Sequence, residues 1–366
     1  MNSKNVDHVF LWITLSLVFG GFFLFLSASL GLLAREGGES FENVFISQIA
    51  LGLFLGSLAM FFISRIHYKY IRKFSFFLFL AGIILTIGVF VPGIGFEHGG
   101  AKRWIDVGFT TFQPSEILKL GFVLYFASWL SASKERVNTF KHGTVPFLAL
   151  LAIPAILLTF EPDMGTFGII AIAGAGMFIT AGGRLSHMAV ITIIGMLSFA
   201  VVVHFKPYLK ERINTFLNPE NDPQGSGYQL NQSLIAVGSG QIFGRGFGQS
   251  IQKFNSLPEP TNDSIFAVAS EEFGFVGSAA IVLVFLFFAM RGLHIAGRAH
   301  DRWGRMTVTG IVLLIITQSF INIASMVGMF PLTGVPLIFI SHGGTALFFA
   351  LAEVGIILSI SRYKTE

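Results

Sequence analysis

The sequence predicts an all-α integral membrane protein with about ten transmembrane helices and a large extracytoplasmic loop between helices 7 and 8. Hydrophobic residues make up 53% of the 366 residues and charged residues 12%, with a mean hydropathy of +0.72, which is far from a soluble composition. Ten apolar runs approach the ~20 residues that cross ~30 Å of hydrocarbon. Basic residues gather in alternate connections between these runs. We therefore expect residues 1–366 to form a single transmembrane domain.

The expected spans follow the hydropathy of the chain. They are residues 9–33, 44–63, 74–91, 113–132, 144–160, 165–181, 187–205, 264–290, 306–328 and 343–361. The first run contains Ser27-Ala-Ser29, which resembles a cleavage site, but it is too long for the core of a signal peptide. We expect it to be a retained span.

The distribution of Lys and Arg predicts the orientation. With the N-terminus inside, 15 of the 24 basic residues fall in inner segments and 8 in outer ones, while Lys119 lies within a span. This asymmetry follows the positive-inside rule. It predicts cytoplasmic termini and an extracytoplasmic 206–262 loop.

Several classes of chemistry are disfavoured by the sequence. The chain has no Cys, and its nine His are scattered without metal-ligand spacing, so no metal-ligating residues are assigned. The glycines of residues 238–248 match neither a Walker nor a dinucleotide fingerprint. The basic residues outside are too sparse to predict a nucleic-acid partner.

Two polar motifs precede or open the fourth span. Lys102 and Arg103 stand beside Trp104 on the outer side. They are consistent with an interfacial anchor or with a phosphate clamp. Glu116 suits the first turn of a helix, whereas Lys119 lies about 5 Å further into the span at 1.5 Å per residue. Their i,i+3 spacing predicts a buried ion pair facing a polar cavity.

Three further motifs lie on the same outer side. Asp163, in Glu161-Pro-Asp-Met-Gly-Thr166, suits a helix cap or a polar site. Arg212 lies in the large loop. The Pro- and Gly-interrupted segment 331–344 contains Ser341, and such a segment is tolerated at membrane depth only when protein buries it or when it lines a cavity.

The stretch from Lys253 to Glu272 contains the strongest functional candidates. It ends the polar loop and enters an apolar helix that still carries carboxylates. Acidic groups at the mouth of a span are costly and are functional candidates by default. Asp263 is the candidate reactive group, while Glu259, in a turn bounded by prolines, is a candidate for shaping the loop.

The ordered motifs resemble those of the SEDS family (shape, elongation, division and sporulation), which includes FtsW and RodA. They are Ala101-Lys-Arg-Trp-Ile, Phe112-Gln-Pro-Ser-Glu-Ile-Leu-Lys, Glu161-Pro-Asp-Met-Gly-Thr, the glycines of residues 238–248, Leu257-Pro-Glu-Pro-x-x-Asp-x-Ile-Phe-Ala, and Gly334-Val-Pro-Leu-x-Phe-Ile-Ser-x-Gly-Gly. The likeness covers essentially the whole chain and leans toward FtsW. Thr261-Asn262, Ile338 and His342 depart from the residues usual in this family.

The resemblance implies a ten-helix fold and peptidoglycan glycosyltransferase activity on lipid II in septal wall synthesis. It implies Asp263 as the catalytic aspartate. It also implies a class B penicillin-binding protein as transpeptidase partner, among other membrane proteins of the divisome or elongasome.

The residue chemistry agrees with this implication. A carboxylate can act as general base for a sugar hydroxyl, and cations can stabilise a departing pyrophosphate. Arg103, Lys119, Arg212 and Lys253 are the phosphate-side candidates, with Glu116, Asp163, Glu259 and Ser341 as further substrate-binding candidates. A divalent cation, Mg²⁺ or Mn²⁺, is compatible with this chemistry, but its ligands cannot be read from the sequence. A RodA-like elongation polymerase, a lipid II flippase without transferase activity, and a non-enzymatic scaffold remain as alternatives.

Overall fold

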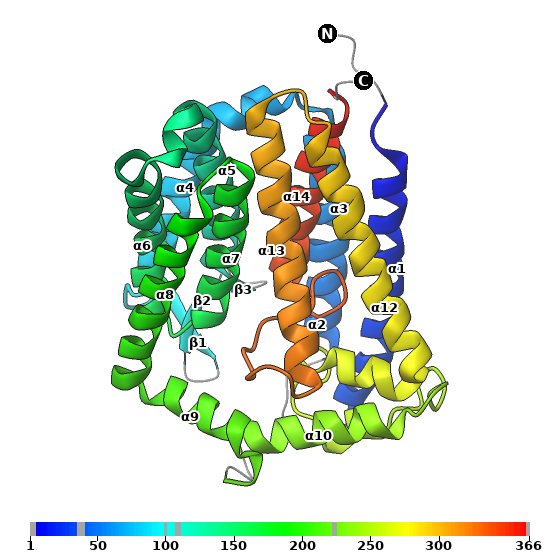
Figure 1. Cartoon of the computed structure of the whole chain (residues 1–366). Helices are drawn as coiled ribbons and strands as arrows, with labels where there is room; N and C mark the ends of the chain where they lie inside the picture. Colours follow the sequence, from blue (N-terminus) through cyan, green and yellow to red (C-terminus); the bar gives the residue numbers. More distant parts are fainter. Residues whose placement is uncertain (1–4, 35–40, 99–100, 107–110, 222–224, 364–366) are drawn as a thin grey trace.

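The computed structural model describes residues 5–34, 41–98, 101–106, 111–221 and 225–363. Figure 1 shows an elongated bundle of roughly parallel helices, in which α1 begins and α14 ends at the same end. At the opposite end, α9 and α10 lie across the bundle. A small sheet lies at that end too.

Each of the ten expected spans corresponds to helical structure. The spanning elements are α1 (His8–Ser29) with η1 (Leu30–Ala34), α2 (Phe41–Ile46) with η2 (Ser47–Leu55) and α3 (Gly56–Arg65), α4 (Tyr68–Gly88), α5 (Pro114–Ser133), α6 (Val145–Phe160), α7 (Met164–Thr180), α8 (Leu185–Phe205), α12 (Ile265–Gly297), α13 (Arg302–Met326) and α14 (Gly344–Ser361). In the described part of the chain, eight helices are long and apolar enough to cross a membrane. The other two are α7, with 17 residues, and α5, which carries Glu116 and Lys119. The predicted fold class is confirmed.

The centre of the bundle is formed by α13 and α14. In the apolar stretch of each helix, 72% and 83% of the residues are buried inside the protein, compared with 6% for the peripheral α8. Small residues allow neighbouring helices to approach closely. A Cβ on Gly82 of α4 would lie 2.7 Å from the Cα of Leu118, and one on Gly121 of α5 would lie 2.7 Å from the Cα of Phe79. The α4–α5 contact therefore depends on glycine at both positions.

The connections toward the α9–α10 end of the bundle are more regular than the sequence suggested. The 92–112 connection contains an antiparallel sheet of order β1-β2-β3, with β1 Gly95–His98, β2 Ala101–Asp106 and β3 Thr111–Phe112. The 206–262 loop contains α9 (Pro207–Leu217), η5 (Pro219–Asn221), α10 (Ser226–Ser239) and α11 (Gln252–Asn255). The α5–α6 connection is also helical, as η3 (Lys134–Asn138) and η4 (Phe140–Thr144).

The long helix α12 is interrupted at Gly274, where φ is +64°. The break frees backbone groups that must find partners in an apolar environment. The amides of Arg245 and Gly246 donate to the carbonyls of Glu271 and Glu272, at 3.0 and 2.9 Å. The amide of Phe275 donates to the carbonyl of Gln241 at 2.8 Å. The glycine-rich loop thus completes the broken helix.

The segment between α13 and α14 is irregular, as the sequence predicted for a broken span, and most of its second half, from Val335 to Ser341, is buried. Polar side chains from α13 satisfy its carbonyls. Asn322 Nδ2 donates to the carbonyl of Val335 at 2.9 Å, and Gln318 Nε2 to that of Pro336 at 3.1 Å. A Cβ on Gly21 of α1 would lie 2.2 Å from the carbonyl oxygen of Phe339, so the segment also packs directly on the α1 backbone.

Candidate functional site

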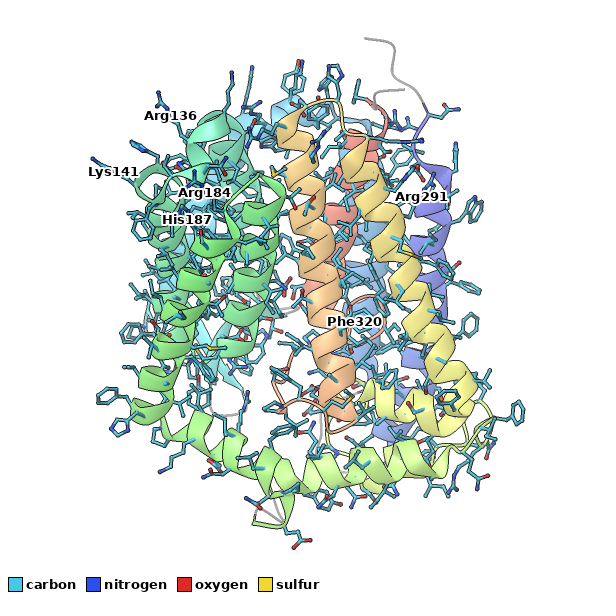
Figure 2. The ribbon with its side chains drawn as sticks, viewed as in Figure 1. Arg136, Lys141, Arg184, His187, Arg291 and Phe320 are labelled. Carbon is cyan, nitrogen blue, oxygen red and sulfur yellow. The ribbon has the colours of Figure 1, made fainter. Side chains whose placement is uncertain are left out.

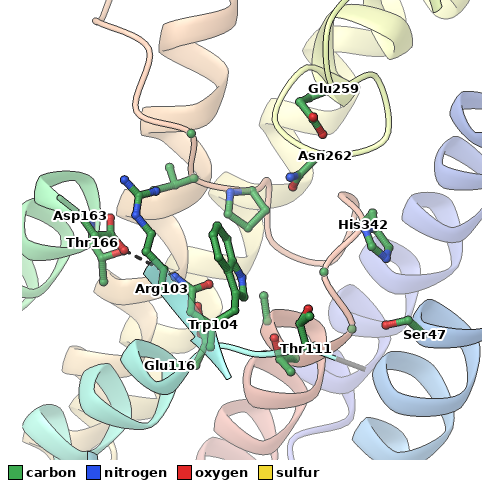
Figure 3. A pocket seen from close by; sticks show the side chains of 18 of the residues that line it. Ser47, Arg103, Trp104, Thr111, Glu116, Asp163, Thr166, Glu259, Asn262 and His342 are labelled. Atoms are coloured by element: carbon green, nitrogen blue, oxygen red, sulfur yellow. Dashed lines mark hydrogen bonds between the residues drawn. The ribbon is translucent and has the colours of Figure 1, made fainter. Parts of the chain in front are cut away.

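A polar cavity of about 150 Å³ lies toward the end of the bundle that carries the sheet, and Figure 3 shows it from close by. The sheet, α5, the start of α7, the loop before α12 and the 334–346 segment all contribute to its lining. Four of the predicted site residues line it, namely Arg103, Glu116, Asp163 and Glu259. Residues from Ser47 to Ala346, far apart in the chain, therefore meet at one place.

Glu116 and Lys119 form the expected ion pair. Lys119 Nζ lies 2.9 Å from Glu116 Oε1, and both side chains are nearly fully buried. Pro114 occupies the first turn of α5 and places Glu116 there too, as predicted. Lys119 also donates to Gln318 Oε1 at 2.8 Å. Since Glu116 and Gln318 line the cavity, the pair belongs to its buried wall.

Asp163 plays the cap role and also faces the cavity. Its Oδ1 accepts from the amide of Thr166 at 3.2 Å, which caps the start of α7. Its Oδ2 accepts from the Thr166 hydroxyl at 2.8 Å. The sequence left open whether Asp163 is a helix cap or part of a polar site. Both are compatible, because its carboxylate caps α7 and also lines the cavity.

Asp263 lies immediately beside the cavity. It directly follows Asn262, which lines the cavity, and a Cβ on the lining residue Gly334 would lie 3.7 Å from its Oδ2. The N-cap of α12 is Ser264, without a side-chain capping hydrogen bond, so Asp263 does not act as a simple cap. The Asp263 carbonyl accepts from Asn322 Nδ2 at 2.8 Å, which fixes the turn against α13.

The surroundings of Asp263 raise its pKa from the usual value to about 6. Burial is the main cause, because it disfavours the ionised carboxylate, and the negative charge of Glu259 adds to it. The charge of Arg212 and a hydrogen bond from Gln229 act in the opposite direction. A carboxylate with this pKa is mostly ionised at neutral pH yet still basic enough to accept a proton.

Two arginines supply positive charge near the cavity. Arg103 Nε donates to the carbonyl of Glu161 at 3.1 Å, and its Nη2 donates to the carbonyl of Pro162. Arg212 Nη1 donates to the carbonyl of Thr333 at 3.2 Å. Burial lowers the pKa of Arg212, and the positive charge of Arg103 lowers it further. The two positive charges repel each other, so an anion bound near both of them would be stabilised.

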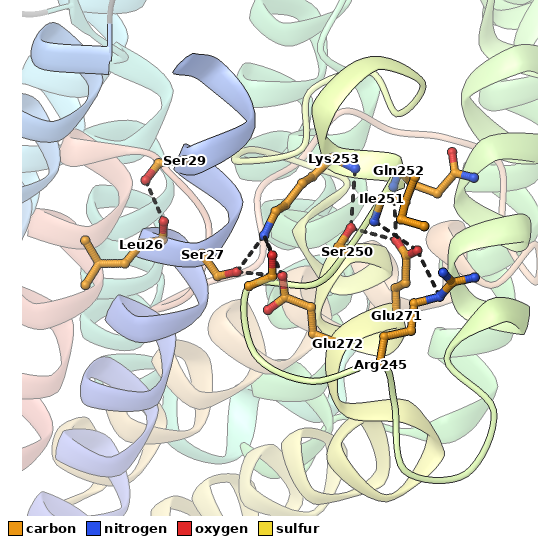
Figure 4. Close-up of polar contacts among 11 residues, drawn as sticks. Leu26, Ser27, Ser29, Arg245, Ser250, Ile251, Gln252, Lys253, Glu271 and Glu272 are labelled. Atoms are coloured by element: carbon orange, nitrogen blue, oxygen red, sulfur yellow. Dashed lines mark hydrogen bonds and ion pairs between the residues drawn. The ribbon is translucent and has the colours of Figure 1, made fainter. Parts of the chain in front are cut away.

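Lys253 lies in a different cluster, shown in Figure 4. It is fully buried, and its Nζ lies 2.8 Å from Glu272 Oε1 and 3.0 Å from Ser27 Oγ of α1. The adjacent Glu271 accepts from the Ser250 hydroxyl at 2.6 Å and lies 3.4 Å from Arg245 Nε. These contacts hold the glycine-rich loop on the broken part of α12. The structure therefore does not bring Lys253 to the cavity, contrary to its prediction as a phosphate-side cation.

Ser341 also stands behind the cavity wall. Its hydroxyl donates to the carbonyl of Asn262 at 2.7 Å and accepts from the amide of Leu337 at 2.8 Å. The next residue, His342, lines the cavity, and its amide donates to the carbonyl of Thr261 at 2.7 Å. Ser341 thus joins the 331–344 segment to the loop that carries Asp263.

We expect Lys253→Met to lower the thermal stability of the protein strongly. The substitution leaves Glu272 buried without its cation, and breaking a buried ion pair costs about 3–5 kcal/mol. Thermal melting of the purified protein measures the effect, with Lys102→Met as a matched change at an exposed lysine. If Lys253→Met melts at the wild-type temperature but loses activity, Lys253 acts on the substrate and not in the fold.

Sequence reasoning missed several polar residues at the site. Gln318 and Asn322 support both the ion pair and the Asp263 turn, and their i,i+4 spacing inside an apolar span was a usable signal. Glu353 lies buried on α14 within electrostatic range of Lys119 and Glu116. The sequence could have indicated Glu353 in the same way as Lys119, because an ionisable residue within a span is a functional candidate.

Glu161 belongs to the same motif as Asp163, but the sequence indicated no function for its side chain. Its side chain is 1% exposed, and burial, followed by the charge of Asp163, raises its pKa to about 8. Arg103 acts in the opposite direction. Glu161 is therefore mainly protonated at neutral pH, so it adds little negative charge beside Arg103.

Comparison with known proteins gives a consistent result over the whole length. The family model described as "Cell cycle protein", which covers FtsW, RodA and SpoVE, matches residues 8–366. Stage V sporulation protein E of Bacillus subtilis is 38% identical over 358 residues, covering 98% of this chain and 97% of that protein. A probable peptidoglycan glycosyltransferase FtsW of Idiomarina loihiensis is 36% identical, covering 98% and 87%.

Solved structures share the fold. A chain from a peptidoglycan synthase complex, described as coordinating polymerization and crosslinking, matches with a TM-score of 0.79 at 24% identity, covering 98% of both chains. The rod shape determining protein RodA of Thermus thermophilus matches with a TM-score of 0.69 at 21% identity, covering 99% of this chain and 98% of RodA. At these identities the likeness concerns the fold.

Proposed function

Because this chain belongs to the family of cell cycle proteins that includes FtsW, RodA and SpoVE, we propose that it is a peptidoglycan glycosyltransferase that polymerises lipid II in septal wall synthesis. The SEDS resemblance of its motifs is thereby confirmed. The observation that carries the proposal is the placement of Asp263 beside a polar cavity that also has Arg103, Glu116 and Asp163 in its wall.

The chemistry joins two sugars while a lipid pyrophosphate leaves. A hydroxyl of the acceptor sugar attacks the anomeric carbon of the donor, and the bond from that carbon to the pyrophosphate oxygen breaks with its electron pair. Asp263 takes the proton from the attacking hydroxyl, since its raised pKa suits a general base near neutral pH. Arg103 and Arg212 stabilise the negative charge that develops on the leaving pyrophosphate.

The Glu116–Lys119 pair positions groups rather than reacting. Lys119 is held between Glu116 and Gln318, and Gln318 in turn holds the backbone at Pro336. This chain of contacts fixes part of the cavity wall. A preorganised polar wall lowers the reorganisation needed when charge develops in the transition state.

A divalent cation would neutralise part of the pyrophosphate charge. Within the described residues, no group of three His, Asp or Glu side chains could hold a metal ion. Asp163 is already engaged by Thr166. The described residues thus offer no three-ligand protein site, and the proposed reaction assigns no residue to Mg²⁺ or Mn²⁺.

The apolar helices make the protein a membrane protein, and we place it in the bacterial inner membrane with both termini in the cytoplasm. The cavity then faces the outside, where the 206–262 segment lies. In Figure 1, α10 and the α12–α13 connection lie at opposite ends of the bundle, in agreement with this placement.

Single cysteines introduced at Gly225 and His300 test the orientation, because the chain contains no Cys. We expect a membrane-impermeant thiol reagent added to intact cells to label position 225 and to leave position 300 unlabelled. Labelling of position 300 but not 225 would reverse the orientation.

The partner that fits this function is a class B penicillin-binding protein, which would crosslink the strands made here, within a divisome or elongasome assembly. Support comes from the structural likeness to a chain of a complex whose printed title joins polymerization and crosslinking. The FtsW relatives favour a septal role over a RodA-like elongation role.

The function is tested with purified protein and lipid II, with and without a cognate class B penicillin-binding protein whose transpeptidase is blocked. We expect glycan strands on a gel in at least the paired reaction. A flippase without transferase activity would instead move lipid II across proteoliposomes and leave it unpolymerised, and a scaffold would do neither.

A further inference from the structure

A second cavity lies at the end of the bundle away from the candidate site. Its volume is about 850 Å³, and its wall includes Trp129, Ser133, Lys134, Arg136, Lys141 and His142. Figure 2 shows Arg136 and Lys141 at the end opposite α9 and α10. Neither the proposed reaction nor the ion pairs described above use these residues.

The local fold holds these basic side chains around the cavity. After α5 ends at Ser133, the chain turns through η3 and η4 before α6 begins. The Thr139 hydroxyl donates to the carbonyl of Arg136 at 2.8 Å, and its oxygen accepts from the amide of His142 at 3.3 Å. Arg302 of α13 donates to the carbonyl of Lys134 at 3.2 Å. The backbone is thus fixed while the basic side chains remain exposed.

The cavity is electropositive. Among the described side chains, Lys134, Arg136 and Lys141 have no carboxylate within salt-bridge distance. Glu135 is the one acidic residue between positions 129 and 146, and its side chain lies outside the described part. Arg184 and His187 lie beside this connection in Figure 2, and His187 contacts the ring of Phe140 edge-on at 5.8 Å.

Exposed apolar side chains neighbour these basic residues in the chain. Phe140, 49% exposed, precedes Lys141, Val145, 47% exposed, begins α6, and Leu185, 74% exposed, follows Arg184. Trp129, in the cavity wall, is a residue typical of the membrane–water interface. A free phosphate would use the basic groups but not the apolar surroundings. A phospholipid would use both, with its headgroup in the cavity and its acyl chains along the helices.

We propose that this cavity binds the phosphate headgroup of an anionic phospholipid from the leaflet on its own face of the membrane. Basic pockets between helices on the cytoplasmic side are suited to such headgroups. Binding would connect the end of α5 to the start of α6. The Glu116–Lys119 pair lies near the other end of α5. The site is independent of the glycosyltransferase chemistry.

The test uses the full-length protein and native mass spectrometry, with phosphatidylglycerol and phosphatidylcholine as the lipid probes. A basic residue near an anionic headgroup contributes about fivefold to binding. We therefore expect the triple variant Lys134→Gln/Arg136→Gln/Lys141→Gln to bind phosphatidylglycerol at least tenfold more weakly than the wild type. Phosphatidylcholine should be retained poorly by both proteins, and millimolar inorganic phosphate should not displace phosphatidylglycerol.

The matched control is Arg65→Gln/Lys69→Gln/Lys73→Gln, which removes the same charge from exposed residues at the end of α3 and the start of α4. It should retain phosphatidylglycerol as the wild type does. If the first triple variant melts at a lower temperature without lipid, Arg136→Gln/Lys141→Gln replaces it. Wild-type lipid retention in the cavity variants, an equal loss in the control, or displacement by inorganic phosphate would each overturn the proposal.

Discussion

The substitution Asp263→Asn is expected to abolish polymerisation of lipid II while leaving a folded protein. Asparagine has the size and the hydrogen-bonding capacity of aspartate, but it cannot accept a proton at neutral pH. Loss of a positioned general base lowers a rate by about 10²–10⁴-fold. The measurement is the initial rate of glycan-strand formation by purified protein at pH 7, alongside its thermal melting curve.

The control for this variant is Asp106→Asn, the same chemical change at an exposed residue of the sheet on the same side of the bundle. It should polymerise lipid II at close to the wild-type rate. A helix-capping role for Asp263 would be largely preserved by asparagine. Near-normal strands from Asp263→Asn would therefore exclude the base role and leave a structural one.

The substitution Lys119→Met is expected to lower both stability and activity. It leaves Glu116 buried without its partner at 2.9 Å and removes a nearby positive charge from the buried Glu353, and breaking a buried ion pair costs about 3–5 kcal/mol. The polar wall of the cavity is disturbed as well, because Gln318 loses the donor at 2.8 Å from its Oε1. Thermal melting and the polymerisation rate are measured on the same preparation.

A double variant separates the two effects. In Glu116→Gln/Lys119→Met the carboxylate of the pair is removed together with the lysine, so much of the lost stability should return. Activity should stay at least tenfold below wild type, since the ion pair is still missing from the wall. If Lys119→Met polymerises lipid II like the wild type, the pair contributes only to the fold or to nothing measurable.

The spans and the Glu116–Lys119 pair could be predicted because they depend on local properties of the chain. Hydropathy over about 20 residues identifies a span, and i,i+3 spacing on a helix places two side chains together. Asp163 was likewise predictable as a cap, since its capping hydrogen bonds reach only three residues along the chain, to Thr166. The resemblance of the ordered motifs to the family then identified Asp263 as the candidate catalytic residue.

The role of Lys253 could not be predicted, because it depends on the interruption of α12 at Gly274. In sequence, Lys253 looks like an outer cation near Asp263. In the structure the broken helix and the glycine-rich loop bury it between Glu272 and Ser27 of α1, and this contact joins residues 226 positions apart. The helices of the 206–262 segment were missed for a related reason, since α9 and α10 lie across the bundle and lack a spanning apolar pattern.

The pH dependence of polymerisation tests most directly the claim that Asp263 is the general base. The carboxylate must be ionised to accept the proton, and its pKa is raised to about 6. The wild-type rate should therefore be nearly constant above pH 7 and fall about tenfold per unit well below pH 6. Any residual rate of Asp263→Asn should lack this fall. A wild-type rate that stays constant from pH 5 to pH 8, or the same fall in the variant, would contradict the assignment of Asp263 as the base.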